Sequence, residues 1–384
     1  MAAPTIGILG GYGNIGRRIV TLLLEQTNAH LVIAGRHILR AREAARDWNA
    51  RYGAERVCAT YAHAADADSV RRAFEGVQLL VVASPTGRFA RDTATAALQI
   101  CCDWLDIQFY TPKLRALSDL SSEIARAGRC FITDAGLHPG LPAQLVRYAV
   151  SCFDTLEAAS VFAVVNPAGG FPRTPSLYEF CRELMRFQAG TYRDSMWRFS
   201  SGLGLGEMRQ ATFGFGFGAR SCMPMMLEEM RALPDLIPNL QETGFYIAGF
   251  NWFTDWVAMP LLLLAGKVVP PLWVKPAAWM LHWATRLFAT PPFGAIIRLQ
   301  ACGNVAGQRQ NLMVECFHPD PFSFTAAAAV AGVLQYLQGR REKGVWLAGH
   351  LLDPAQTLSD LQRMGVHLAS EQFPFQGTCP FCKR

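Results

Sequence analysis

The sequence lacks the features that mark membrane-spanning, secreted and nucleic-acid-binding proteins. Its longest uninterrupted apolar stretch, residues 257–265, is far shorter than the roughly 20 residues that cross a bilayer. The opening MAAPTIGILG has no charged region, apolar core and cleavage site in series, so we expect a cytoplasmic protein whose 11 cysteines are reduced thiols. Only 17% of the residues are charged, and the net charge of +6 is scattered, which argues against nucleic acid as a partner.

Hydrophobic residues are abundant instead. They make up 51% of 384 residues, enough for two domains with buried interiors. The most apolar region, residues 246–297, allows three interpretations: a buried core, a homodimer interface, or a surface in peripheral contact with a membrane. The last is considered because a basic residue, Lys275, accompanies five tryptophans, Trp252, Trp256, Trp273, Trp279 and Trp283.

Alternation of short apolar runs with amphipathic segments organises the first third of the chain. Residues 5–9 and 31–34 have the pattern of buried parallel strands, and residues 14–25 and 38–52 that of helices. Four more strands are expected at 57–61, 79–83, 104–107 and 130–133, with helices at 68–74, 89–101 and 112–127 between them. Six strands joined by helices predict a Rossmann-type, doubly wound parallel sheet of the α/β class.

A glycine-rich turn joins the first strand to the first helix. It fits the G-x-G-x-x-G pattern, in which the glycines allow a tight turn, close approach of a pyrophosphate and packing of the helix on the strand. The helix N-terminus would then hold the phosphates of a dinucleotide. The expected cofactor-binding residues here are Gly11, Tyr12, Gly13, Asn14, Ile15 and Gly16.

The residues after the second and fourth strands bear on which dinucleotide binds. An NAD site usually has a carboxylate after the second strand, whereas this chain has Arg36, with Arg40 one helical turn later. An arginine suits a 2′-phosphate, so we expect NADP. Ser84, Pro85 and Thr86 follow the fourth strand, either beside the cofactor ribose or as ordinary turn residues.

The alternation stops after residue 140, where a second domain of the α+β class begins. Residues 158–165 and 296–316 have the pattern of antiparallel strands, the latter turning at 303–307. Residues 323–337 form an alanine-rich helix, and residues 345–368 end in another helix. We therefore expect a dinucleotide-binding domain over 1–145, a substrate and dimerisation domain over 146–320, and C-terminal helices over 321–384 that return to the first domain.

A family resemblance rests on the block DAGLHPGLP at residues 134–142. Together with GGYGNIG, AGR, FYTPKLRAL, GVWLAGHLLDP and LQRMGV, it resembles the saccharopine dehydrogenase-like reductases, including carboxynorspermidine dehydrogenase-like enzymes. The resemblance covers residues 1–150 and 325–384. It implies a Rossmann domain, a dimerising substrate domain and hydride transfer from NADPH to an imine carbon. Some relatives have an aspartate where His138 stands.

Candidate catalytic residues lie where the fifth and sixth strands end. His138 is a candidate general acid or carboxylate anchor, although a histidine in a turn can also bond only to backbone. Asp106 and Asp134 are candidates for contact with the nicotinamide or a substrate amine, or else they cap the next helix. Tyr110 offers a phenol that either donates a proton or packs on the sheet. In the second domain, Arg173 either binds a substrate carboxylate or lies in a surface loop.

The residues and the resemblance together predict an NADP(H)-dependent oxidoreductase that acts on a C=N bond of an amino-acid- or amine-derived imine. Two alternatives remain open: a trans-acting enoyl reductase for a lipid or polyketide, and a cofactor-dependent scaffold on a membrane. The expected substrate is a small molecule, with a hydrophobic one allowed by the tryptophan-rich segment. We expect no metal, because Cys379 and Cys382 are half of a zinc site without a second pair.

Overall fold

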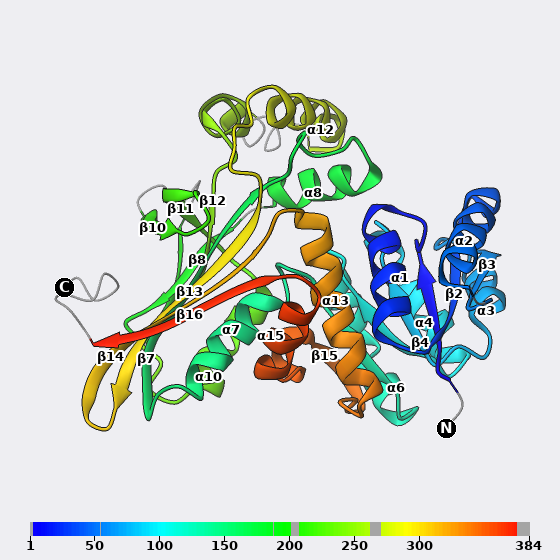
Figure 1. The fold of residues 1–384 in the computed structure, drawn as a ribbon, viewed down its shortest axis with the longest axis horizontal. Coiled ribbons are helices and arrows are strands. Elements are labelled where there is room, and N and C mark those ends of the chain that lie inside the picture. The colour runs from blue at the N-terminus through cyan, green and yellow to red at the C-terminus, as the bar shows by residue number, and fades with distance from the viewer. Residues whose placement is uncertain (1–2, 54, 187, 201–206, 262–269, 375–384) are drawn as a thin grey trace. The chain divides into compact units, whose positions relative to one another are not determined.

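The computed structural model describes residues 3–53, 55–186, 188–200, 207–261 and 270–374 (Figure 1). The chain divides into two compact units. The first unit comprises Met1–Leu141 and Thr325–Met364, and the second comprises Pro142–Phe324 and Gly365–Arg384. Both units are therefore built from two separate stretches of sequence.

A seven-stranded parallel sheet forms the centre of the first unit. Its strand order, β15-β6-β5-β4-β1-β2-β3, is that of a doubly wound Rossmann-type sheet with one added edge strand, which confirms the predicted fold class. The sequence analysis predicted six strands and missed β15. The strands are β1 (Thr5–Leu9), β2 (His30–Gly35), β3 (Val57–Tyr61), β4 (Leu79–Val82), β5 (Asp103–Asp106), β6 (Cys130–Thr133) and β15 (Gly344–Leu347).

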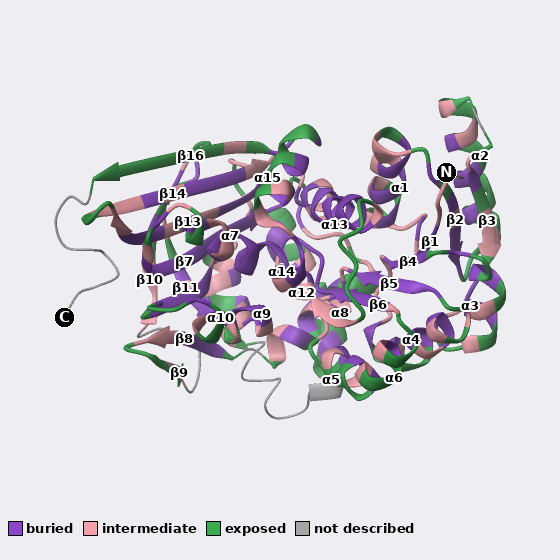
Figure 2. Cartoon of the chain, turned by 90° about the horizontal axis from the view of Figure 1, so that it is seen from below, coloured by how far each residue is buried: buried purple, intermediate pink, exposed green. Residues whose placement is uncertain are grey.

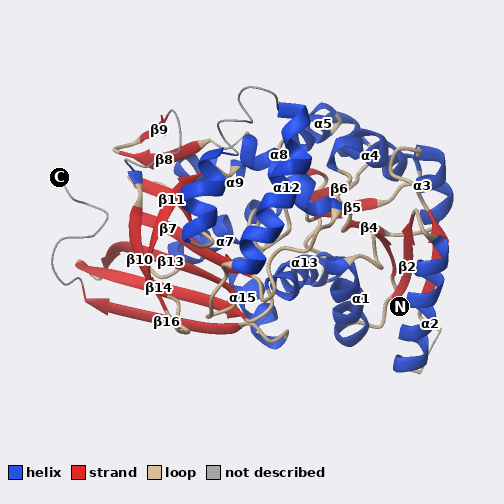
Figure 3. Ribbon diagram, turned by 90° about the horizontal axis from the view of Figure 1, so that it is seen from above, coloured by secondary structure: helices blue, strands red, loops and turns tan. Residues whose placement is uncertain are grey.

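Helices cover both faces of this sheet, with α4 and α5 on one side and α1 and α13 on the other (Figure 3). The segment at 112–127, predicted as one helix, is broken at Leu120. The N-cap of α3 is Asp66. The Asp66 side chain accepts a hydrogen bond from the Ser69 backbone N–H. The helices are α1 (Asn14–Gln26), α2 (Ile38–Tyr52), α3 (Ala67–Phe74), the 3₁₀ turn η1 (Gly87–Phe89), α4 (Ala90–Gln99), α5 (Pro112–Asp119), α6 (Ser121–Arg126), α13 (Pro321–Leu337), α14 (Ala348–Leu351) and α15 (Pro354–Arg363).

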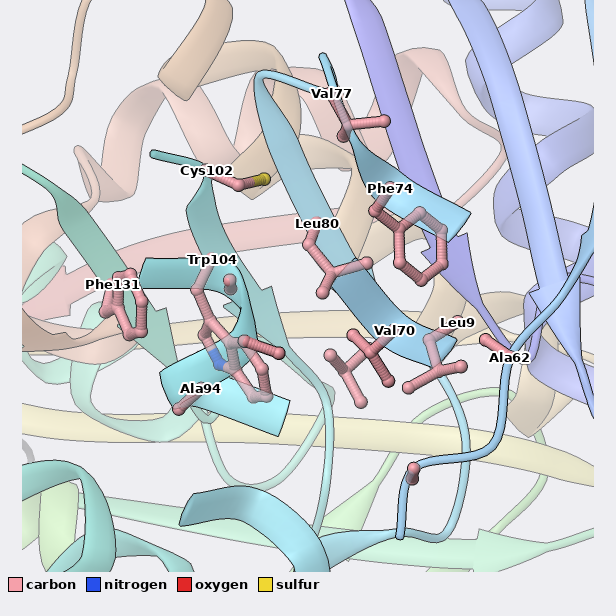
Figure 4. Close-up of a cluster of buried hydrophobic side chains, with 14 of the residues drawn as sticks. Leu9, Ala62, Val70, Phe74, Val77, Leu80, Ala94, Cys102, Trp104 and Phe131 are labelled. Carbon is pink, nitrogen blue, oxygen red and sulfur yellow. The ribbon is translucent and has the colours of Figure 1, made fainter. Parts of the chain in front are cut away.

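Large apolar side chains fill the space between the sheet and helices α3 to α6 (Figure 4). Trp104 and Phe131, on neighbouring strands, stack with ring centroids 5.8 Å apart. On the opposite face, α13 is buried along most of its length (Figure 2). There Tyr336 donates a 2.6 Å hydrogen bond to the buried carboxylate of Asp103. The sheet is thus fixed from both sides, and its carboxyl edge is a rigid platform.

A mixed nine-stranded sheet forms the second unit. The main path is β10-β11-β12-β7-β13-β14-β16, with β8 paired to β12 and β9 paired to β8. Only β12 and β7 are parallel neighbours along it. Its elements are α7 (Leu141–Val150), β7 (Thr155–Asn166), α8 (Pro175–Met185), β8 (Ala189–Arg193), β9 (Met196–Ser200), β10 (Arg209–Phe213), β11 (Gly218–Met225), α9 (Glu228–Arg231), α10 (Leu233–Leu236), β12 (Glu242–Ala248), the π-type turn η3 (Thr254–Ala258), α12 (Pro270–Leu287), β13 (Gly294–Val305), β14 (Gln308–His318) and β16 (His367–Pro374).

The predicted antiparallel strands of this unit are confirmed. β13 and β14 pair from Val305 and Gln308 outward, so the turn consists of Ala306 and Gly307. Both have positive φ, 50° and 76°, as a two-residue hairpin of the type I′ class requires. After α15 the chain leaves the first unit, and β16 pairs with β14 at the edge of the second sheet.

Candidate functional site

The turn between β1 and α1 is held in place by its glycines. Gly10 has φ +88°, a left-handed conformation that favours glycine, and a Cβ atom there would lie 2.7 Å from the Cβ of Ser84. A Cβ on Gly11 would lie 2.7 Å from Ile33 Cγ2, and one on Gly16 would overlap the Gly10 carbonyl oxygen. The packing of strand, turn and helix therefore requires these three glycines, with or without a ligand.

Gly13 is different, because the protein alone does not require it. Its φ of −74° suits any residue, and a Cβ atom would lie 3.1 Å from the Gly10 carbonyl oxygen. Gly13 is the N-cap of α1, and the first N–H groups of a helix, here on Asn14 and Ile15, have no acceptor within the helix. The first turn of α1 also carries no acidic residue. This end of α1 thus has the donors and dipole that bind a phosphate.

Tyr12 connects the glycine turn to the end of β2. Its hydroxyl accepts a 2.9 Å hydrogen bond from the His37 backbone N–H. Its ring covers Gly35, where a Cβ atom would lie 2.7 Å from Tyr12 Cε1. Arg36 follows Gly35 directly and is exposed, as is Arg40 in the first turn of α2. Arg36 therefore lies beside the glycine turn, at the carboxyl end of β2.

The segment Ser84, Pro85 and Thr86 also reaches the glycine turn, since Ser84 packs against Gly10. The Ser84 and Thr86 hydroxyl oxygens are 3.1 Å apart, and the Thr86 N–H donates to the Ser84 carbonyl oxygen at 2.8 Å. All three residues are partly exposed. The structure thus brings together the predicted residues that follow β1, β2 and β4.

Gln108 is a site residue that the sequence analysis missed. It follows β5, is 5% exposed, and donates from Nε2 to the Ser84 carbonyl oxygen at 2.8 Å and to Thr86 Oγ1 at 2.9 Å. A carbonyl oxygen only accepts, so the amide nitrogen must face Ser84. Gln108 Oε1 is buried and has no hydrogen-bond partner within the described part of the chain. A buried acceptor of this kind normally receives a donor, which a ligand hydroxyl or carboxamide would supply.

The predicted carboxylates Asp106 and Asp134 share a buried partner, Lys113. Lys113 is 1% exposed, and its Nζ lies 2.5 Å from Asp106 Oδ1 and 2.7 Å from Asp134 Oδ1. Its third donor goes to the Gln108 carbonyl oxygen. Asp106 also accepts from Trp104 Nε1 at 2.8 Å and from the Gln108 N–H at 3.1 Å. The ammonium group thus joins the ends of β5 and β6 to the start of α5.

The buried ion cluster pairs both Asp106 and Asp134 with one lysine. Burial lowers the pKa of Lys113, but the two carboxylates outweigh it and raise the pKa above 10.5, so the ammonium stays charged. Asp134 also adopts a left-handed backbone, with φ 59°. Because Lys113 and Asp106 together bind both the N–H and the carbonyl oxygen of Gln108, the cluster sets the position of that side chain.

His138 and Tyr110 occupy the two loops that extend from these strands. His138 lies in the turn between Gly136 and Gly140, where the Gly136 N–H donates to the Pro139 carbonyl oxygen at 3.0 Å. Burial lowers the pKa of His138, so its imidazole is neutral at pH 7. A neutral ring exchanges protons, but it does not attract a carboxylate by charge. The Tyr110 ring packs on Gly87, where a Cβ atom would lie 2.6 Å from Tyr110 Cβ.

Arg173 belongs to the second unit. It lies between β7 and α8 and is exposed. The glycine pair before it packs closely on α12, since a Cβ on Gly170 would lie 2.7 Å from the Arg286 backbone nitrogen.

Two other features of the sequence do not belong to the predicted site residues. Cys379 and Cys382 lie outside the described residues. Arg209–Phe213 and Gly218–Met225 form the antiparallel pair β10 and β11.

Comparison with known proteins gives structural neighbours only. No family model and no curated protein matches the sequence. Among solved structures, apo saccharopine dehydrogenase (L-Glu forming) from Saccharomyces cerevisiae is 14% identical, with 97% of this chain and 100% of that chain covered and a TM-score of 0.71. The C. glutamicum DAP dehydrogenase in complex with DAP is 13% identical, covers 94% of this chain and 99% of that chain, and has a TM-score of 0.46. The yeast likeness extends over nearly the whole of both chains and confirms the resemblance at the level of the fold.

Proposed function

We propose that this protein is an NADP(H)-dependent oxidoreductase that reduces the C=N bond of an imine derived from an amino acid or amine. The observation that carries the proposal is at the carboxyl edge of the parallel sheet. There Ser84 packs on the glycine turn, which leads into a helix without a side-chain cap, and Ser84 also binds Gln108, whose buried Oε1 has no partner among the described residues. Ligands bind at this edge in open α/β sheets. The donor and acceptor set therefore fits a dinucleotide.

Each part of the site would hold a different part of the cofactor. The N–H groups at the start of α1 would bind the pyrophosphate beside Gly13, and Arg36 would pair with a 2′-phosphate. Gln108 Oε1 would accept a hydrogen bond from a ribose hydroxyl or the carboxamide. When bound, the nicotinamide supplies the hydride.

The assignment of an imine as substrate rests on chemistry that the fold and the site share. The yeast neighbour's name describes a dehydrogenation that releases L-glutamate, an amine product. His138 lies at the ligand-binding edge, and because burial keeps its imidazole neutral it would contact a substrate nitrogen as an uncharged hydrogen-bonding group. Asp106 and Asp134 are bound to Lys113 and are assigned no step in proton transfer.

An activity assay tests this function. The purified protein should oxidise NADPH when an amino acid and an oxo acid are supplied together, and not with either alone. Gly13→Ala should weaken NADPH binding at least tenfold, because the methyl group enters the space for the pyrophosphate, while it destabilises the fold by only about 0.5–1 kcal/mol. Quenching of tryptophan fluorescence measures the binding.

Gln26→Ala, at the other end of α1, is the matched control and should bind NADPH like the parent. Unchanged binding in Gly13→Ala would remove the glycine turn from the cofactor site. Binding of NADPH without turnover of any amine and oxo-acid pair would retain the cofactor and reject the imine.

A second candidate is the reduction of an enoyl C=C bond carried by a lipid. The observation that favours it is the set of exposed tryptophans on the second unit, which suits a substrate delivered at an apolar surface. This candidate would be selected if the protein reduces a carrier-bound enoyl thioester and does not act on any amine and oxo-acid pair.

Arg36 should decide between the two dinucleotides. Arg36→Ala should weaken NADPH binding by about tenfold to a hundredfold, since it removes a charge-assisted contact with the 2′-phosphate, and should leave NADH binding unchanged. Arg46→Ala is the control, because Arg46 is exposed in the helix that follows Arg36. Equal losses for NADPH and NADH, or none, would contradict selection through Arg36.

A further inference from the structure

Helix α12 presents its largest apolar side chains outward. The inward side consists mainly of small residues, among them Ala277, Ala278 and Ala284, which are 2% exposed or less. The outward side carries Leu272, Trp279 and Trp283, which are 74%, 54% and 39% exposed. Positions 272, 279 and 283 fall on one side of a helix with 3.6 residues per turn. This distribution is the reverse of that in a helix that faces water.

The inward side packs on α8, which lies under α12 in Figure 1. Leu177 and Cys181 of α8 form a buried cluster with Ala277, Ala278 and Leu281. The internal packing of α12 is thus complete without its tryptophans, and the described chain does not cover the outward side.

The turn η3 extends the apolar surface. Trp252, just before it, and Trp256, within it, are 62% and 71% exposed. Phe253 stacks on Phe288, just beyond α12, with ring centroids 4.6 Å apart, and Asn251 Nδ2 donates to the Ala284 carbonyl oxygen at 3.4 Å. We call this surface the tryptophan face; it consists of Trp252, Trp256, Leu272, Trp273, Trp279 and Trp283. A buried-core role, one of the three interpretations of the sequence, is therefore wrong for these tryptophans.

The charges around the tryptophan face are positive. Lys275 and Arg286 are exposed on one flank of the outward side of α12, and the Arg286 guanidinium lies 5.9 Å from the centroid of the Trp283 ring. Residues 250–288 contain a single acid, Asp255. Its carboxylate accepts a 2.8 Å hydrogen bond from the Phe250 N–H and lies over Gly249. The surface is thus apolar and aromatic with a basic edge.

We propose that the tryptophan face docks peripherally on the surface of an anionic lipid bilayer. Tryptophan side chains favour the interface between headgroups and acyl chains, and lysine and arginine beside them attract anionic headgroups. A two-fold contact would instead place the same surface on both sides, and among residues 250–288 only Asp255 could offer an acid to the basic edge. None of the described helices is long and apolar enough to cross a bilayer.

Flotation with vesicles tests the aromatic contribution. The full chain should float with vesicles of phosphatidylcholine and phosphatidylserine. The double variant Trp279→Gln/Trp283→Gln should bind about tenfold more weakly, since it removes two exposed apolar side chains from the contact. Leu39→Gln/Met196→Gln is the matched control, because Leu39 and Met196 are 75% and 59% exposed outside the tryptophan face. It should bind like the parent, and an equal loss in both variants would overturn the proposal.

Variants that remove a positive charge test whether the tryptophan face binds lipid and not another partner. Lys275→Gln and Arg286→Gln should each weaken binding to the anionic vesicles about fivefold, whereas the exposed control Arg46→Gln should not. Vesicles of phosphatidylcholine alone should bind more weakly than the anionic ones. No flotation with the anionic vesicles would overturn the proposal, as would self-association without lipid that Trp279→Gln/Trp283→Gln abolishes. The second result would identify the face as an interface between copies.

Discussion

Replacing Lys113 with methionine should lower the free energy of unfolding by about 3–5 kcal/mol. The substitution keeps most of the side-chain volume but removes the charge that Asp106 and Asp134 share, at distances of 2.5 and 2.7 Å. Two buried carboxylates would then face each other without a counter-ion. Equilibrium unfolding in urea measures the loss.

Two further variants show whether charge is the cause. Lys343→Met replaces an exposed lysine in the same unit and should change the stability little. Adding Asp106→Asn and Asp134→Asn to Lys113→Met removes all three charges and should recover part of the loss, because no uncompensated charge stays buried. If the triple variant is less stable than Lys113→Met alone, the cluster is held by shape and not by charge.

The pH dependence of this effect follows from the direction of the pKa shift. The carboxylates raise the pKa of Lys113 above 10.5, so its contribution to stability is complete below that pH and is lost as the pH rises through the raised pKa. The difference between the parent and Lys113→Met should therefore persist at neutral pH and shrink in strong alkali, and it should also shrink in acid, where the unpaired carboxylates of the variant take up protons. A difference that already disappears between pH 7 and 9 would contradict a charged ammonium group.

Local patterns in the sequence were sufficient for most of the Rossmann unit. The apolar periodicity predicted α2, β3 and β6 with the bounds that the structure shows. It missed β15, which is short, only partly buried and followed directly by a helix. It also missed β12 in the second unit, which pairs with β7 although α8 and strands β8 to β11 lie between them in the sequence. Pairing between segments so far apart in the chain leaves no periodic signal.

The sequence likewise predicted only that part of the candidate site which lies within one local motif. Gly11, Gly13 and Gly16 lie within one turn, so the motif alone placed them. Lys113 contacts carboxylates that follow two different strands, and the three groups meet only because β5 and β6 are neighbours in the sheet. An aspartate at the end of a strand looks the same in sequence whether it is catalytic or ion-paired. One signal was present: no other lysine precedes Lys267 in the chain, so Lys113 stands alone among many arginines.

Asp255→Asn should make the protein more stable at neutral pH. Burial raises the pKa of Asp255 from 3.8 to about 6, against the smaller opposing effect of the hydrogen bonds from the N–H groups of Phe250 and Asn251. The folded chain therefore binds more protons than the unfolded chain between these values, and its stability falls as the pH rises through the interval. The difference between the pKa values of Asp255 in the folded and unfolded chain lowers the free energy of unfolding by about 3 kcal/mol at pH 7.

Asparagine keeps an oxygen to accept the Phe250 N–H and has no charge to bury, so the gain should approach about 2–3 kcal/mol at pH 7 and vanish near pH 4. Urea unfolding at a series of pH values measures it. Asp235→Asn, at an exposed acid of the same unit, should show no such pH-dependent gain. A gain that is the same at pH 4 and pH 7 would mean that asparagine improves the packing of the turn, and that the charge of Asp255 carries no cost.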